Sequence, residues 1–193
     1  MRVPSHTAPV LREGGVSLIE ALITVFVLSI GMLGMASLQA RAQQAELESY
    51  QRSQALLLLD DITNRISANR DFVECYTQDD STATTLLYFG TSTPTALVDS
   101  GCDVLAGQDL QAWNDLLNGA AETLAGASVG AVLGARGCIQ NLGVDRYIEI
   151  SVAWQGQLPV TPPPATVLCG KGLYGDDAFR RVVTRRMRFA NLQ

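Results

Sequence analysis

The chain has 193 residues, with 14 Lys and Arg against 19 Asp and Glu, and a formal net charge of −5 at pH 7. A protein with this excess of acidic residues is not expected to present the basic surface that nucleic-acid binding needs, so we do not expect nucleic acid as a partner. The only histidine, His6, precedes the first apolar segment, so the rest of the chain has no Ser-His or Cys-His nucleophilic pair and no His-ligated metal site. We therefore predict a protein that is not an enzyme and that has no cofactor, no catalytic residues and no metal site.

A long apolar segment lies near the N-terminus. The 25 residues from Val16 to Ala40 carry one charge, Glu20. About 20 apolar residues cross the hydrocarbon core of a bilayer, so the segment predicts a transmembrane helix. A carboxylate inside a bilayer costs roughly 2.5 kcal/mol or more, which marks Glu20 as functional and predicts an amine partner. Cleavage after Gly15 would give Val16 a new α-amino group, which can pair with Glu20 of a neighbouring copy.

The sequence Gly15-Val16-Ser17-Leu18-Ile19-Glu20, followed by an apolar helix, resembles the class III leader of type IV pilins and pseudopilins. The resemblance implies cleavage between Gly15 and Val16 by a prepilin peptidase, N-methylation of Val16, and a role for Glu20 in aligning subunits during assembly. The run from Leu28 to Gln39 is most similar to minor pilins of the PilV type. Two features depart from the family pattern: Val16 stands where Phe is usual, and no proline lies near Ser37.

The same resemblance implies an organisation and a function. A leader (1–15) would precede the transmembrane and filament-core half of the N-terminal helix (16–40) and a periplasmic globular domain (41–193). The expected fold is α+β and type IV pilin-like, with a long N-terminal helix packed on a small antiparallel sheet. The protein would sit in the inner membrane with its N-terminus in the cytoplasm, and later in the pilus filament. The implied partners are other minor and major pilins, the prepilin peptidase, the inner-membrane assembly platform and a tip adhesin.

The resemblance further implies that this minor pilin primes assembly or lies near the filament tip, in support of twitching motility and adhesion. A minor pseudopilin of type II secretion shares the same N-terminal motif, and a DNA-uptake pilin has only the C-terminal arginines in its favour. Another hypothesis is a secreted enzyme or binding domain freed by cleavage after Ala42, at the site Ala40-Arg41-Ala42. The apolar segment is longer than the roughly 7 to 15 residues of an ordinary signal peptide, and such a peptide leaves Glu20 unexplained, as does a plain single-span anchor.

The first helix is predicted to continue from Leu38 through Arg70, because apolar residues recur there on one face. The four leucines Leu56 to Leu59 cover more than one stripe, which predicts that the domain wraps this segment on two sides. From Asp71 to Gly107 we expect loops with one short strand near 85–89, and Asp79-Asp80 as a solvated turn rather than a calcium site.

A short helix is predicted over Gln108 to Leu117, with Asp109 near its start and Trp113 as a core anchor. The glycines Gly126, Gly130 and Gly134 predict a flexible or closely packed linker.

Strands are predicted over 137–140, 147–155 and 179–192, with a turn at 141–143 and a Pro-rich loop at 157–164. Residues 147–155 alternate in polarity, which predicts a half-buried strand. The last strand carries Arg180, Arg181, Arg185, Arg186 and Arg188. We interpret this arginine cluster as protection of an exposed edge or face, with Arg185 partly covered, and keep a partner or phosphate surface as the alternative.

The four cysteines, Cys75, Cys102, Cys138 and Cys169, form no C-x-x-C pair, which argues against a zinc ribbon or a thioredoxin-type site. An even number in an exported domain predicts two disulfides, with three connectivities open. We favour Cys75 with Cys102 and Cys138 with Cys169, because each bond would close an irregular loop onto neighbouring structure.

Overall fold

The computed structural model describes residue 15 and residues 17–77, 88–90, 102–120, 123–124, 127–128, 132–143 and 147–190. The chain forms two compact units, Met1–Gln43 and Gln44–Gln193. Residues 1–14, Val16 and Asp79-Asp80 lie outside the described residues, so the predictions for them remain predictions. Helix α1 spans Leu18–Ala68, close to the predicted end at Arg70.

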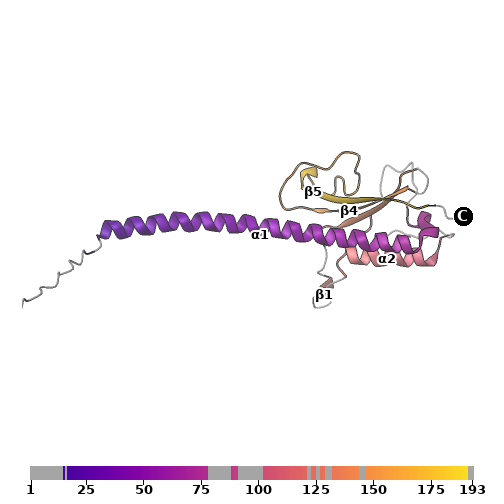
Figure 1. Cartoon of the computed structure of the whole chain (residues 1–193), viewed down its shortest axis with the longest axis horizontal. Helices are drawn as coiled ribbons and strands as arrows, with labels where there is room; N and C mark the ends of the chain where they lie inside the picture. The colour runs from indigo at the N-terminus through magenta and orange to yellow at the C-terminus, as the bar shows by residue number, and fades with distance from the viewer. Residues whose placement is uncertain are drawn as a thin grey trace, which may run out of the picture. The chain divides into compact units, whose positions relative to one another are not determined.

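The second unit combines two α-helices with a three-stranded antiparallel sheet (Figure 1). After α1 come a 3-10 turn η1 (Arg70–Cys75) and helix α2 (Val104–Leu117), and then a two-stranded pair, β1 (Thr123–Leu124) with β2 (Ala127–Ser128). The main sheet has the order β3 (Arg136–Asn141), β4 (Tyr147–Gln155) and β5 (Arg180–Arg188), with η2 (Asp177–Phe179) before its last strand. This architecture confirms the predicted α+β fold.

One face of α1 supplies much of the core of the second unit. Its buried apolar residues recur every three or four positions, which places them on a single stripe: Ala55, Leu59, Ile62 and Ile66. They pack in one cluster with alternate residues of β4, namely Ile148, Ile150, Val152 and Trp154. Leu56 and Leu57 are 40% and 61% exposed. The prediction that the domain wraps the four leucines on two sides is therefore wrong, because the domain covers only one face of the helix.

Strand β4 has the predicted bounds but is buried on both faces, so the prediction of a half-buried strand is wrong. Its second face, at Ala153, packs in a separate cluster with Cys138 and Cys169 and with the partly buried Tyr174. Residues 156–176, which contain no helix or strand, hold Cys169 and Tyr174 in that cluster. The Pro-rich loop 157–164 is thus irregular, as predicted, and the residues that follow it cover the second face of the sheet.

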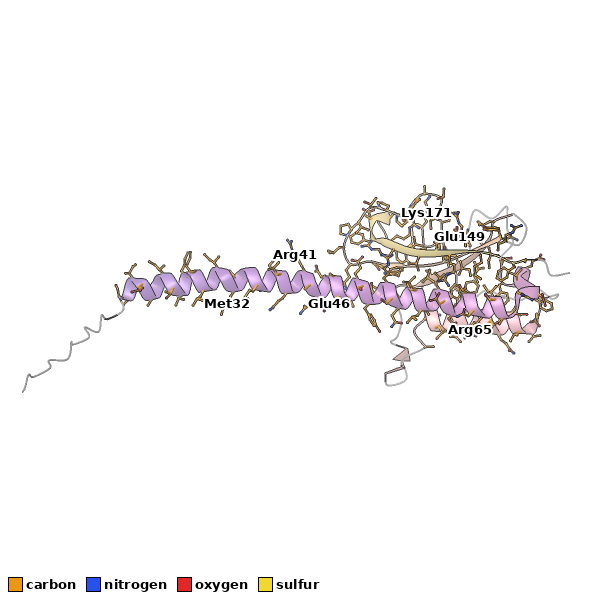
Figure 2. The ribbon with its side chains drawn as sticks, viewed as in Figure 1. Met32, Arg41, Glu46, Arg65, Glu149 and Lys171 are labelled. Carbon is orange, nitrogen blue, oxygen red and sulfur yellow. A yellow bond between two sulfur atoms is a disulfide. The ribbon has the colours of Figure 1, made fainter. Side chains whose placement is uncertain are left out.

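Helix α2 begins at Val104, four residues before the predicted start, with Asp103 as its N-cap. Asp109 therefore lies in the second turn and does not stabilise the helix start, contrary to the prediction. Its carboxylate instead accepts hydrogen bonds from Arg65 Nη1 at 3.0 Å and from the Tyr76 hydroxyl at 2.6 Å. Figure 2 places Arg65 where α1 runs beside α2. Burial, followed by the bond to Asp109, raises the pKa of Tyr76.

Trp113 is fully buried, which confirms its prediction as a core anchor. Its indole Nε1 donates to the Leu58 carbonyl at 2.8 Å, and its ring centroid lies 5.2 Å from that of Phe89. Phe89 in turn exchanges two backbone hydrogen bonds with Gly137 at the start of β3. This bridge is the described part of the strand predicted near 85–89; residues 85–87 lie outside the described residues.

The remaining connections agree with the predictions only in part. Gly143 N–H donates to the Asn141 side chain at 3.0 Å, which confirms the turn after β3. Residues 127–128 pair with 123–124 where a linker was predicted, and Gly126 and Gly130 lie outside the described residues. Strand β5 ends at Arg188, short of the predicted end at residue 192.

Gly137 is expected to tolerate no side chain. A Cβ there would overlap the six-membered ring of Trp113 and lie 2.7 Å from Leu117 Cδ1, and both belong to buried side chains. We expect Gly137→Ala to lower the free energy of unfolding by about 2 to 3 kcal/mol, as overpacking does. Urea unfolding of the full chain in detergent micelles would measure this. Gly34→Ala is the control, because a Cβ at Gly34 meets nothing within 4 Å, and equal stability of the two variants would contradict the prediction.

Candidate functional site

The start of α1 carries the residues that the sequence marks as functional. The Ser17 carbonyl accepts the N–H groups of Glu20 at 3.0 Å and Ala21 at 3.2 Å, so the helix begins immediately after it. Gly15 lies ahead of the helix, and a Cβ built on it meets nothing within 4 Å. The peptide segment that the resemblance assigns to the peptidase thus precedes the helix, with open space around Gly15. Val16 lies outside the described residues.

Within the first unit, α1 exposes apolar side chains around its whole circumference. Leu18 is 78% exposed and Met32 69% exposed, and Figure 2 shows such side chains pointing outward on all sides. This helix is long and apolar enough to cross a membrane. A helix that is apolar all round is stable only where lipid or other helices surround it. The exposed surface therefore requires a membrane or an assembly.

The polar side chains in this apolar segment differ in whether they have a hydrogen-bond partner within the helix. Thr24 Oγ1 donates to the Ala21 carbonyl and Ser29 Oγ to the Val25 carbonyl, both at 2.8 Å. Such bonds within the helix let hydroxyls enter an apolar medium at low cost. The Glu20 side chain makes no hydrogen bond or ion pair with any residue that the structure describes. Its carboxylate is the group whose burial calls for a partner from another molecule.

The first of the C-terminal arginines, Arg180, is fully buried. Its Nε and Nη2 donate to the two Asp177 oxygens at 2.7 and 2.8 Å, and its Nη1 to the carbonyls of Val167 and Cys169 at 2.9 and 3.0 Å. The bond from Arg180 holds the pKa of Asp177 below its usual range. The interpretation of the cluster as edge protection is wrong for this residue, because Arg180 ties residues 167–169, which follow the Pro-rich loop, to β5.

Three other arginines of the cluster bind carboxylates of the same domain. Arg181 pairs with Glu48 and Arg185 with Asp60, both on α1, whereas Arg186 pairs with Glu149 on β4 at 2.7 Å. The side chain of Arg185 is 40% exposed, which agrees with the prediction that it is partly covered. These ion pairs fasten β5 to α1 and to β4. They give three of the five arginines a carboxylate partner, although the side chain of Arg186 stays 66% exposed.

Two disulfides close the irregular segments, which confirms the prediction of disulfide bonds. Cys75 is bonded to Cys102, with Cα atoms 5.5 Å apart, and Cys138 to Cys169, with Cα atoms 5.9 Å apart. The first joins the end of η1 to the residue before the α2 cap, and the second joins β3 to the loop over β4. Among the described residues, no group of three His, Cys, Asp or Glu side chains is arranged to hold a metal ion.

A family model described as "Tt1218-like: Type IV pilin Tt1218" matches residues 37–103. Comparison with curated proteins and with solved structures gives no match. The matched range covers about a third of the chain, from the middle of α1 to the α2 cap. It does not include Gly15 to Glu20, so two separate parts of the chain point to type IV pilins. The match supports a type IV pilin, a structural subunit that assembles with other pilins.

Proposed function

We propose that the protein is a minor pilin of a type IV pilus, of the PilV type. The observation that carries the proposal is the exposed apolar first half of α1, which begins a few residues after the Gly15-Val16 bond. Within it, the Glu20 side chain has no partner among the described residues. The separate match of residues 37–103 to a type IV pilin model supports the coarser part of the proposal, a type IV pilin.

The proposed pathway begins in the inner membrane, with the leader 1–15 in the cytoplasm and the domain 41–193 in the periplasm. A prepilin peptidase cuts between Gly15 and Val16 and N-methylates Val16. Residues 16–40 then move from lipid into a filament core made of similar helices. Both surroundings are apolar, so the transfer requires no unfolding.

Assembly supplies the partner for the Glu20 carboxylate, which has none among the described residues. The α-amino group of Val16 on one subunit lies in the same apolar layer as the carboxylate of the next, and the ion pair fixes the axial position of the incoming helix. An unpaired charge there would be strongly unfavourable, so the pair selects one position. We propose that the subunit primes assembly or lies near the filament tip, and that it serves twitching motility and adhesion.

The test is the intact mass and N-terminal sequence of the protein recovered from membranes, with and without reductant. We expect an N-methylated Val16 at the N-terminus and a mass increase of about four daltons on reduction, from two disulfides. An N-terminus at Gln43 would instead indicate ordinary signal-peptidase cleavage after Ala42 and would refute the proposal.

A further inference from the structure

Strand β5 is one edge of the main sheet, because the strand order is β3, β4, β5. Along an antiparallel strand, residues whose N–H and C=O groups face one neighbour alternate with residues whose groups face the other side. Gly137 of β3 exchanges both of its backbone bonds with Phe89, on the side away from β4. Val152 of β4 stands opposite Gly137, so the backbone groups of Val152 face away from β3 and toward β5.

The register of β4 with β5 then decides which residues of β5 face outward. Val183 stands opposite Val152 and faces it, and the alternation turns Val182, Thr184 and Arg186 the other way. The backbone groups of these three residues make no hydrogen bond to any residue that the structure describes. Each residue carries one N–H and one C=O group. The stretch 182–186, which we call the open edge, therefore presents a row of three N–H and three C=O groups.

The start of β5 already has a backbone partner on its outer side. The Val160 N–H, in the Pro-rich loop, donates to the Ala178 carbonyl at 2.9 Å, whereas the Phe179 carbonyl accepts from the Gly156 N–H at 2.7 Å. Ala178 thus faces outward and Phe179 faces the β4 side, which agrees with the alternation along β5. Farther along, the side chain of Thr184 is exposed. The outer side of β5 therefore accepts a backbone partner at its start, and the open edge follows beyond it.

The row of backbone groups on the open edge identifies a class of ligand. Outward-facing residues of a strand recur at every second position, about 6.8 Å apart, and each offers a donor beside an acceptor. Another strand matches this pattern group for group, and strand addition to a sheet edge is a recurring mode of peptide recognition. A phosphate or an isolated carboxylate has only acceptors, so it would leave the carbonyls without donors. The ligand that fits the open edge is therefore an extended polypeptide segment.

The side chains beside the open edge favour an acidic segment over a second copy of β5. Arg186 is 66% exposed, and its bond to Glu149 uses Nε, which leaves the other donors of the guanidinium. Two copies of β5 would place five arginines against five, and like charges on paired strands are destabilising. On the other face of β5, Val183 and Met187 are half-buried. Apolar residues of an added strand would extend this partly covered surface.

We propose that the open edge binds an extended, acidic segment of another protein as an additional antiparallel strand. Residues of the segment opposite Val182, Thr184 and Arg186 exchange backbone hydrogen bonds with β5. The residue opposite Arg186 carries a carboxylate, and the residues between these positions are apolar and lie on the side of Val183. This inference goes beyond the proposed function and does not depend on it.

The first test follows the exchange of single amide protons by NMR, in the full chain in detergent micelles. In the chain alone, the Thr184 and Arg186 amides should exchange at least about tenfold faster than the Val183 and Arg185 amides, which face β4. Slow exchange of all four amides at every protein concentration would mean that the chain itself fills the edge. Protection that grows with protein concentration would mean that a second copy fills it. Either result would overturn the proposal.

The second test adds the blocked peptide acetyl-Val-Glu-Val-Thr-Val-Thr-Val-amide, whose Glu and Thr residues are placed to pair with the open edge. At saturation, the Thr184 and Arg186 amides should exchange at least about tenfold more slowly than in the chain alone. N-methylation of the first Thr of the peptide removes a donor to β5 and should weaken binding at least about tenfold. N-methylation of the preceding Val changes a group that faces away from β5 and should leave binding unchanged. No protection by the peptide, or equal binding of the two N-methyl peptides, would refute strand pairing.

A variant of the protein tests the same bonds from the other side. Thr184→Pro removes an outward N–H, a change that edge strands tolerate, and should weaken peptide binding at least about tenfold. Thr184→Val is the matched control, because it loses the same hydroxyl and keeps the N–H. Equal binding by the two variants would contradict the proposal. If Thr184→Pro does not fold, the two N-methyl peptides still decide the question.

Peptides with Gln or Arg in place of Glu test the charge of the partner. The Gln peptide should bind about two- to fivefold more weakly than the Glu peptide, which is the range for one cross-strand charge pair. The Arg peptide should bind more weakly still, because it places like charges opposite each other. Equal binding of the three peptides would show that the edge does not select an acidic partner, and the proposal would be lost.

Discussion

Replacement of Glu20 by Gln is expected to reduce the amount of the protein in sheared filaments at least about 100-fold, with no loss from the membrane. Removal of one partner of a buried ion pair costs about 3 to 5 kcal/mol, and each 1.4 kcal/mol corresponds to a factor of ten. In the variant, the Val16 amine of the neighbouring subunit would remain in an apolar layer without a counter-charge. Immunoblots of sheared filaments and of membranes from the same cells would measure both amounts.

The membrane level of this variant separates assembly from insertion. Glutamine is neutral, so its transfer into the bilayer costs less than that of a carboxylate, and the membrane level should stay equal or rise. Glu46→Gln is the matched control, because it removes an exposed carboxylate from the same helix beyond the apolar segment. A Glu20→Gln variant that enters filaments as well as Glu46→Gln would mean that the carboxylate has no part in assembly.

The sequence predicted the elements whose signals are local. The period of apolar residues set the end of α1 to within two residues, and alternation set the bounds of β4. It could not predict that β4 is buried on both faces. That burial arises because residues 156–176 fold back over the sheet. The pattern of polar and apolar residues along β4 gives no information about this distant segment.

The start of α2 was missed for a similar reason. The apolar period begins at Leu110, so the sequence pointed to a start at Gln108 and gave Asp109 the role of a charge at the helix end. The N-cap is Asp103. The Asp109 carboxylate instead accepts a hydrogen bond from Arg65, which is 44 residues away in the sequence. The role of a carboxylate near a predicted helix start therefore cannot be assigned until its partner elsewhere in the chain is known.

The arginine cluster shows which ion pairs can be predicted from the sequence and which cannot. Adjacent in sequence, Arg180 and Arg181 point to opposite faces of β5, and the partner of Arg181, Glu48, lies 133 residues before it. Only the ion pair of Arg180 with Asp177 joins residues that are close in the sequence, three positions apart, so only this pair could have been predicted from neighbouring residues.

Arg180→Leu is expected to lower the free energy of unfolding by about 3 kcal/mol, the combined cost of a half-buried ion pair and of two carbonyls left without donors. The variant leaves Asp177 without its partner and removes the donors to the Val167 and Cys169 carbonyls. Arg180→Lys should recover only part of the loss, because an ammonium group cannot reproduce the two parallel bonds of the guanidinium. Arg185→Leu is the control: both partners of its ion pair are well exposed, so its loss should be at most about 1 kcal/mol.

The pH dependence of this loss tests its electrostatic origin. Arg180 lowers the pKa of Asp177 in the folded protein. The stabilisation from this pair is therefore complete above the unfolded pKa of about 3.9, and it is lost as the pH falls through the lower, folded value. The difference in unfolding free energy between wild type and Arg180→Leu should narrow in urea titrations as the pH is lowered from 7 to about 2. A difference that stays constant over this range would assign the loss to packing and the carbonyl bonds, with no contribution from the charge of Asp177.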